Sequence, residues 1–538
     1  MKTKIDLSAK KILIIEDRAI MRETIKHILV DLGARFFVEA ESGVNAMAAM
    51  RKEKFDIVLC DYNLGEGKNG QQILEEAKYL KLLPLNAIFI MVTGEQHQSV
   101  ILSILDHKLD DFLIKPFNRQ QLLGRLERCY VIKEYLADID REIDNGNLYQ
   151  AINNCEKLLE QDNKKMRLQL LKTRAELAIK ISDFKTAAKI YQEILKEREI
   201  PWARLGLGII AFSNDNFTQA IVSFQQVINE TPTMLEAYDW LAKSHEALGD
   251  HEEALSTINS AIELCPLTIL RQKRLALLAD KTDNVPVAKK AYGAAVQLGK
   301  HSIHKSPEDY AGLAKAHLKT NSTNEALKTL LDLSQQFHND PEGKLRAATL
   351  EIDIYKKIDK EGLAKQSYDK AIKLNAQFGN QASRGLRLEM AKACHLYGDT
   401  QISEEILADL VKTNIDDKQF IDTVGEMCTT FIGDNYAEIL LRQVKQELID
   451  VNNKGVSLFK EGKIDEALAV FEEAIEKMPD NQTIILNMAK IMVHDIKTSG
   501  GTQEKILNAQ AYINKAIQLG IPHNKIGGLQ AELDKANQ

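Results

Sequence analysis

"FDIVLCDYNLGEGKNG", residues 55–70, decides the fold of the N-terminal part of the chain. A mostly apolar run leads directly into Asp61, and a glycine-rich turn follows. A short continuous apolar run of this kind indicates a strand buried on both faces, as in a parallel sheet. A carboxylate at the very end of such a strand needs a chemical reason.

The same pattern repeats between residues 10 and 128, where short apolar runs alternate with amphipathic stretches. The apolar runs begin at Lys11, Arg35, Phe55, Ala87 and Asp110. Five β/α units in this space predict an α/β doubly wound five-stranded parallel sheet of the flavodoxin-like type, with helices on both faces.

The residues that end these predicted strands are polar. Glu16 and Asp17 follow the first strand, Asp61 ends the third, Thr93 the fourth and Lys115 the fifth. Ligands of such sheets bind outside the carboxyl ends of the strands, so we expect these side chains to meet at one edge.

Three neighbouring carboxylates repel one another unless a hard cation lies among them, and Mg²⁺ prefers such oxygen ligands. A carboxylate beside Mg²⁺, with an ammonium and a hydroxyl placed to receive phosphoryl oxygens, suits in-line phosphoryl transfer. Asp61 is therefore a candidate nucleophile, with Lys115 and Thr93 as its partners.

These residues, in this order along residues 10–128, resemble the receiver domain of bacterial two-component response regulators. The resemblance implies that Asp61 is the phosphoacceptor and that the domain spans residues 1–128. It also implies that Asp17 binds Mg²⁺ directly and Glu16 binds it through water. The backbone carbonyl of Asn63 would complete the protein ligands.

Further roles follow from the same resemblance. Lys115 and Thr93 would hold the phosphoryl oxygens, and the bond from Lys115 to Pro116 would be cis. Phe112 would rotate inward as Thr93 moves, which makes these two the switch residues. Asn63 and Glu95 resemble the pair that flanks the attacking water in chemotaxis-type receivers, which implies a phosphate lifetime of seconds to minutes.

The rest of the chain contains a repeat of 34 residues. Gly208, Ala220 and Pro232 are followed at this spacing by Ala242, Ala254 and Pro266, and Gly455, Ala467 and Pro479 repeat the form. Small residues let paired helices approach closely, and proline ends the second helix. The pattern resembles the tetratricopeptide repeat. It predicts an all-α superhelix. The predicted parts are a helical connector at 129–146, repeats at 147–411, an irregular helical pair at 412–447 and C-terminal repeats at 448–538.

Stacked repeats form an extended concave surface that suits peptides or partner helices. Trp202, Phe212 and Lys243 are candidate partner-binding residues on the inner helices. The alternative for the aromatic pair is packing between repeats, and the class of ligand stays open.

Composition limits the remaining choices. The 538 residues carry a net charge of −7 without a dense run of Lys and Arg, which argues against nucleic acid as a partner. The first apolar stretch is too short for a signal peptide, and no apolar run reaches the length that spans a bilayer. We expect a cytoplasmic protein without membrane insertion. The six cysteines are too scattered for a disulfide framework or a zinc site.

Together these features favour a response regulator whose output is phosphorylation-dependent protein binding through the repeats. The expected partners are a sensor histidine kinase or small phosphodonor and a protein in the repeat groove, with a possible homodimer through the receiver. The face formed by the fourth and fifth helices would carry the signal. We expect no enzyme activity beyond phosphorylation and autodephosphorylation at Asp61. The alternative is a phosphate sink or a constitutive scaffold without a switched partner.

Overall fold

A computed structural model of the chain describes residues 5–95, 97–107, 109–161, 164–378, 381–415, 417–433, 436–521 and 523–536. The chain divides into two compact units, Met1–Thr329 and Leu330–Gln538. All six cysteines, each within the described residues, are buried free thiols. Among the described residues, no helix combines the length and apolarity that a membrane crossing requires.

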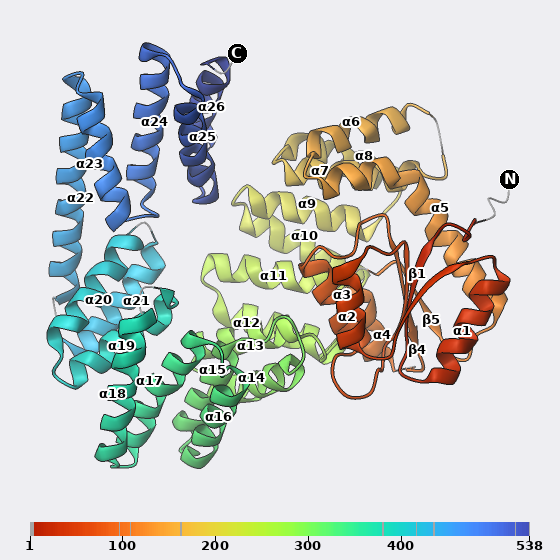
Figure 1. Cartoon of the computed structure of the whole chain (residues 1–538), viewed down its shortest axis with the longest axis horizontal. Coiled ribbons are helices and arrows are strands. Elements are labelled where there is room, and N and C mark those ends of the chain that lie inside the picture. The colour runs from red at the N-terminus through yellow and green to blue at the C-terminus, as the bar shows by residue number, and fades with distance from the viewer. Residues whose placement is uncertain are drawn as a thin grey trace. The chain divides into compact units, whose positions relative to one another are not determined.

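The first unit begins with the predicted sheet of five parallel strands (Figure 1). Their order is β2-β1-β3-β4-β5. The strands are β1 (Lys11–Ile15), β2 (Phe36–Ala40), β3 (Ile57–Asp61), β4 (Ile88–Thr93) and β5 (Asp111–Ile114). Strand β3 lies in the middle and every residue of it is buried. The continuous apolar run before Asp61 thus follows from burial on both faces.

Helices cover both faces of the sheet because alternate residues of each strand point to opposite sides. On one face Leu13, Val58 and Phe89 pack beneath α2, α3 and α4, and on the other Ile12, Leu59 and Ile90 pack beneath α1 and α5. The helices are α1 (Ala19–Asp31), α2 (Gly43–Lys52), α3 (Gly70–Tyr79), α4 (Gln98–Asp106) and α5 (Arg119–Asp144). The predicted doubly wound fold is confirmed.

Helix α5 joins the sheet domain to the repeats without interruption. Asn118 begins it with a capping box, and Leu122 and Leu126 near its start pack in the core of the sheet domain. Farther along, Leu136 and Ile139 pack with the first repeat helices. The predicted connector at 129–146 therefore corresponds to the part of α5 from Cys129 to Asp144 and the turn that follows it.

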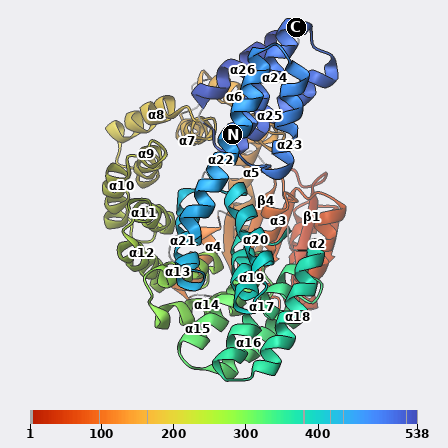
Figure 2. The same cartoon turned by 90° about the vertical axis from the view of Figure 1, so that its left-hand side faces the viewer.

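Helix pairs fill the rest of the first unit, and α8 to α13 stack along a curved row (Figure 2). Gly208 shows why small residues are needed there: a Cβ built on it would lie 2.5 Å from the ring of Phe224. These helices are α6 (Leu148–Leu159), α7 (Arg167–Lys180), α8 (Phe184–Glu197), α9 (Pro201–Ser213), α10 (Phe217–Glu230), α11 (Leu235–Leu248), α12 (His251–Leu264), α13 (Ile269–Lys281), α14 (Val285–Gly299) and α15 (Pro307–Lys319).

Helix α16 (Thr323–Gln336) contains the boundary between the units, and the described residues of the second unit form helices and connecting turns without a strand. Gly455 lies against Phe471 there, with the same spacing as Gly208 and Phe224. Its helices are α17 (Pro341–Lys357), α18 (Glu361–Phe378), α19 (Arg384–Leu396), α20 (Thr400–Thr413), α21 (Lys418–Phe431), α22 (Tyr436–Lys460), α23 (Ile464–Lys477), α24 (Gln482–Ser499), α25 (Gln503–Gln518) and α26 (His523–Ala536).

The predicted irregular pair at 412–447 corresponds to α21 and the first half of α22. Helix α22 continues for 25 residues and supplies Gly455 to the next repeat. The predicted boundary at residue 447 thus falls inside α22, whose Leu440 and Val444 pack in one core cluster while Val451 and Val456 pack against the next.

Candidate functional site

The acidic residues predicted to meet at the edge of the sheet do so. One carboxylate oxygen from each of Glu16, Asp17 and Asp61 lies within 4.8 Å of the others. Glu16 and Asp61 are buried at the ends of β1 and β3, and Asp17 is exposed. The strand ends position this cluster, since β1 and β3 are hydrogen-bonded neighbours.

Lys115 lies between two of the carboxylates. Its Nζ is 2.7 Å from Glu16 Oε2 and 2.9 Å from Asp61 Oδ2. The backbone of Lys115 is paired with β4, because Lys115 N donates to Thr93 O at 2.8 Å. The following bond to Pro116 is cis, as the resemblance implies.

The cluster fits a divalent cation. Glu16 is fully buried, and its Oε1 has no hydrogen-bond partner among the residues that the structure describes. Burial raises the pKa of Glu16 above its ordinary value, against the hydrogen bond from Lys115. Burial likewise raises the pKa of Asp61, and Lys115 opposes the rise. A buried carboxylate oxygen without a donor, beside two further carboxylates, offers the oxygen ligands that Mg²⁺ prefers.

One of the two predicted switch residues adjoins this cluster, since Thr93 O accepts a hydrogen bond from Lys115 N. Thr93 is fully buried, and its Oγ1 accepts a hydrogen bond of 3.0 Å from the backbone N of Glu95. Phe112 is partly buried and packs against the core cluster that contains Ile104 of α4. Thr93 therefore contacts the segment that leads to α4, and Phe112 packs against the same apolar core as that helix.

Asn63 and Glu95 lie near the rim of the site. Asn63 is exposed, and its Oδ1 accepts from Gly65 N at 3.2 Å, while Glu95 is partly buried. Their predicted influence on phosphate lifetime stays a prediction, as does the ligand role of the Asn63 carbonyl.

Gly70 is a site residue that sequence reasoning missed. A Cβ built on it would lie 2.4 Å from the backbone oxygen of Asp61 and 2.7 Å from Met91 Sδ. Gly70 begins α3 after the capping residue Asn69, so the helix starts directly against the end of β3. The dipeptide Asn69-Gly70 at the end of the quoted stretch is the signal that could have found it.

The predicted partner-binding residues of the repeats are partly buried. The Trp202 ring packs edge-on to Tyr191, and Phe212 packs edge-on to Trp240. Lys243 Nζ lies 4.3 Å from the centre of the Trp240 ring. Both predicted aromatic residues thus contribute to packing between repeat helices, and a role in binding stays a prediction.

Comparison with known families agrees with this architecture. The family model described as "Response regulator receiver domain" matches residues 12–127. Two models described as "Tetratricopeptide repeat" match residues 235–266 and 458–494.

Curated relatives match the N-terminal region. Chemotaxis protein CheY-3 of Vibrio cholerae is 31% identical over 123 residues, which are 22% of this chain and 91% of the relative. Chemotaxis protein CheY of Bacillus subtilis is 32% identical over 120 residues, 22% of this chain and 97% of the relative.

Solved structures resemble each part of the chain. A CheY-like receiver domain protein from Methanospirillum hungatei is 27% identical, with a TM-score of 0.22, over 23% of this chain and 96% of its own. A tetratricopeptide repeat protein from Parabacteroides merdae is 13% identical, with a TM-score of 0.30, over 45% of this chain and 93% of its own. The chain belongs to the response regulator family, and it joins a CheY-like receiver domain to tetratricopeptide repeats.

Proposed function

We propose that this response regulator accepts a phosphoryl group on Asp61 and that the phosphorylated state changes protein binding by the repeats. The observation that carries the proposal is the position of Lys115 between Glu16 and Asp61, beside the unpartnered Oε1 of Glu16. The expected donors are a sensor histidine kinase or a small phosphodonor.

In the proposed reaction an oxygen of Asp61 attacks the donor phosphorus, and the bond from phosphorus to the leaving group breaks. Lys115 Nζ and the Thr93 hydroxyl stabilise charge on the phosphoryl oxygens. Asp17, Asp61, Glu16 through water and the Asn63 carbonyl would hold Mg²⁺. When bound, this ion would neutralise phosphoryl charge.

The output we propose is binding of a protein partner by the repeats, in the cytoplasm and without further enzyme activity. Stacked helix pairs present the extended surface that such binding needs. Coupling requires that the partner bind the two states of the receiver with different affinity, typically by about 1–3 kcal/mol.

The first experiment measures phosphorylation of the full chain by acetyl phosphate with Mg²⁺, on a phosphate-affinity gel. We expect a shifted band that Asp61→Asn and chelation of Mg²⁺ both abolish. Asp56→Asn is the matched control, because Asp56 precedes the same strand and lies at its opposite end, where it accepts from Lys11 N. Labelling that survives in Asp61→Asn would refute the assignment.

The second experiment tests the output. Lysate pull-downs compare full chain treated with beryllofluoride and Mg²⁺, untreated chain and Asp61→Ala. A partner whose capture differs between the treated chain and the other two supports a switched adaptor. Equal capture in all three would support the phosphate sink or constitutive scaffold.

The lifetime of the phosphoryl group is a separate proposal that rests on Asn63 and Glu95. Loss of the gel shift after removal of acetyl phosphate should take seconds to minutes. A half-life of hours would contradict the role of this pair.

A further inference from the structure

Within the first unit, the receiver contacts the repeats through α3 and α4. Gln72 Nε2 of α3 donates to Leu298 O at 3.0 Å, and the Tyr79 ring packs edge-on to His304. Leu102 of α4 packs against the apolar cluster that contains Leu235 and Tyr238 of α11. The sequence predicts that the fourth and fifth helices form the signalling face. Helix α4 does meet the repeats, and α3 accompanies it there.

Arg271 at the start of α13 is the polar centre of this contact. Its Nη1 and Nη2 donate to the two carboxylate oxygens of Asp106 on α4, at 2.8 and 3.0 Å. Its Nε and Nη2 also donate to Asp239 of α11, at 2.9 and 2.7 Å. Arg271 is only 4% exposed, so this fork holds α4 where water competes little.

The arrangement suits a contact that opens and closes. If α4 withdraws, Arg271 loses Asp106 and keeps Asp239, so opening leaves no unpaired buried guanidinium. The group of one guanidinium and two carboxylates also has a net negative charge, so Asp106 and Asp239 repel each other while the contact is closed. Both features limit the free-energy cost of opening.

The contact lies next to the phosphoacceptor. Tyr62, the residue after Asp61, lines a cavity of about 50 Å³ whose other walls include Leu267, Ile269 and Leu298 of the repeats. Thr93 Oγ1 accepts a hydrogen bond from the backbone N of Glu95, in the segment that leads to α4. A change at Asp61 or Thr93 therefore reaches the repeats through one neighbouring residue or one short loop.

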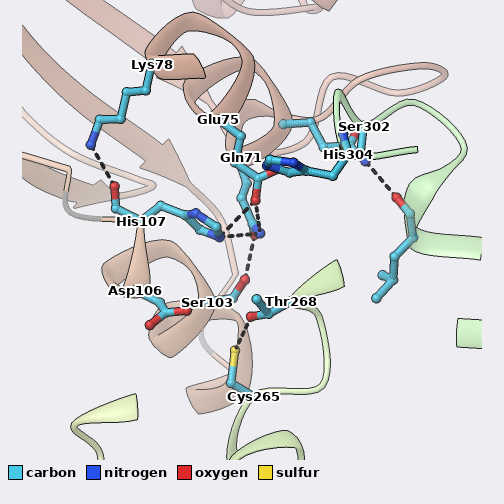
Figure 3. A network of polar contacts seen from close by, with 12 residues as sticks. Gln71, Glu75, Lys78, Ser103, Asp106, His107, Cys265, Thr268, Ser302 and His304 are labelled. Carbon is cyan, nitrogen blue, oxygen red and sulfur yellow. Dashed lines mark hydrogen bonds and ion pairs between the residues drawn. The ribbon is translucent and has the colours of Figure 1, made fainter. Parts of the chain in front are cut away.

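Helices α3 and α4 are joined by buried polar contacts (Figure 3). Ser103 Oγ of α4 donates to Gln71 Oε1 of α3 at 2.5 Å, and Gln71 Nε2 lies 2.7 Å from His107 Nε2. His107 Nε2 is 3.0 Å from a carboxylate oxygen of Glu75. This network makes the two helices one body, so a displacement of α4 also moves the α3 contacts.

Helix α5, in contrast to α4, connects the receiver and the repeats permanently. It is continuous from the receiver into the first repeat, and Lys133 pairs with Asp110 at 2.8 Å. Receiver and repeats are therefore held together at α5 whatever the state of α4.

We propose that α4 is an internal ligand of the repeats, which phosphorylation of Asp61 withdraws. The vacated site on α11 and α13 then takes a partner helix with an apolar side chain and a carboxylate one turn apart, as Leu102 and Asp106 are. This rests on the proposed function and names its partner chemistry and regulation.

Hydrogen exchange of the full chain tests the withdrawal. Beryllofluoride with Mg²⁺ should speed exchange at the starts of α11 and α13 about tenfold, and this change should be absent in Asp61→Asn. Asp106→Asn should raise exchange there without beryllofluoride. Glu53→Gln is the matched control, since it removes a carboxylate that pairs with Lys11 at the start of β1 and should change nothing at the contact.

The two proposals fail in different ways. Protection of the 61–70 loop by beryllofluoride, with exchange of α11 and α13 unchanged, would overturn the internal ligand and leave phosphorylation standing. A loop that gains no protection would count against the proposed function, and the withdrawal would fall with it.

A peptide of residues 97–107, cross-linked into a helix, probes the vacated site by fluorescence anisotropy. This peptide should bind the Asp106→Asn chain about tenfold more tightly than it binds the wild-type chain. A second peptide that carries Asp106→Asn should bind the Asp106→Asn chain about tenfold more weakly than the first peptide does. Equal affinity of both peptides, or of both chains for the first peptide, would overturn the assigned partner chemistry.

Discussion

Replacement of Gly70 by Ala adds one methyl group directly against the phosphoacceptor strand. The new Cβ would lie 2.4 Å from the backbone oxygen of Asp61, whereas real Cβ contacts lie beyond 3.0 Å. The Asp61 backbone or the start of α3 must therefore move by at least the difference, 0.6 Å. Neither moves freely, because Tyr62 N donates to Val92 O and Gly70 N donates to Tyr62 O.

The expected cost has two parts. Overpacking of a filled site costs about 1–3 kcal/mol in the free energy of unfolding, and the better helix propensity of Ala recovers at most about 1 kcal/mol. The catalytic cost is larger in effect, because misplacing a reacting group by about 1 Å slows a reaction by about a hundredfold. We expect phosphorylation of Gly70→Ala to be about ten to a hundred times slower.

Initial rates of labelling by acetyl phosphate, with circular dichroism to verify folding, measure this effect. Gly94→Ala is the control, since Gly94 follows Thr93 in the same site and its Cβ would meet no atom within 4 Å. It should label at close to the wild-type rate. A folded Gly70→Ala that labels at the wild-type rate would refute the argument from close approach.

Gly208→Ala should lower the free energy of unfolding by about 1–3 kcal/mol, because its Cβ meets Phe224. Gly293→Ala should raise the free energy of unfolding by about 0.5–1 kcal/mol, because the nearest atom to its Cβ is 4.0 Å away. Thermal melts in which both variants shift the melting temperature in the same direction would contradict this. Burial raises the pKa of Asp140 from 3.8 to about 6, so the native state loses stability as pH rises through 6. Asp140→Asn should therefore stabilise the chain by about 1 kcal/mol at pH 7.5 and by nothing below pH 3.8. A stabilisation that grows as the pH falls would contradict this prediction. Glu16→Gln should raise the Mg²⁺ concentration needed for half-maximal labelling about tenfold, and an unchanged requirement would exclude Glu16 from the metal site.

The receiver could be predicted from the sequence because each of its signals is local. The run before Asp61 is apolar at every buried position of β3, and the polar residue that follows each strand can be read directly. Parallel topology then brings Glu16, Asp61 and Lys115 to one edge without further information.

The contact between receiver and repeats could not be predicted in this way. Asp106 and Arg271 are 165 residues apart, and each alone resembles an ordinary charge on a helix surface. Gly70 was hidden for a related reason: its importance depends on the approach of α3 to β3, which no sequence spacing gives.

If phosphorylation withdraws α4 as we propose, the placement of this helix explains how a receiver can govern a repeat array to which it is joined by a continuous helix. A flexible linker would let the two parts separate in both the phosphorylated and the unphosphorylated state, so a change of a few kcal/mol at Asp61 would alter few contacts between them. In our proposal α5 keeps the parts joined, and the contact that varies is confined to Leu102, Asp106 and the α3 residues beside them. A tethered contact reforms without loss of translational freedom, so small differences between the two receiver states suffice to shift it.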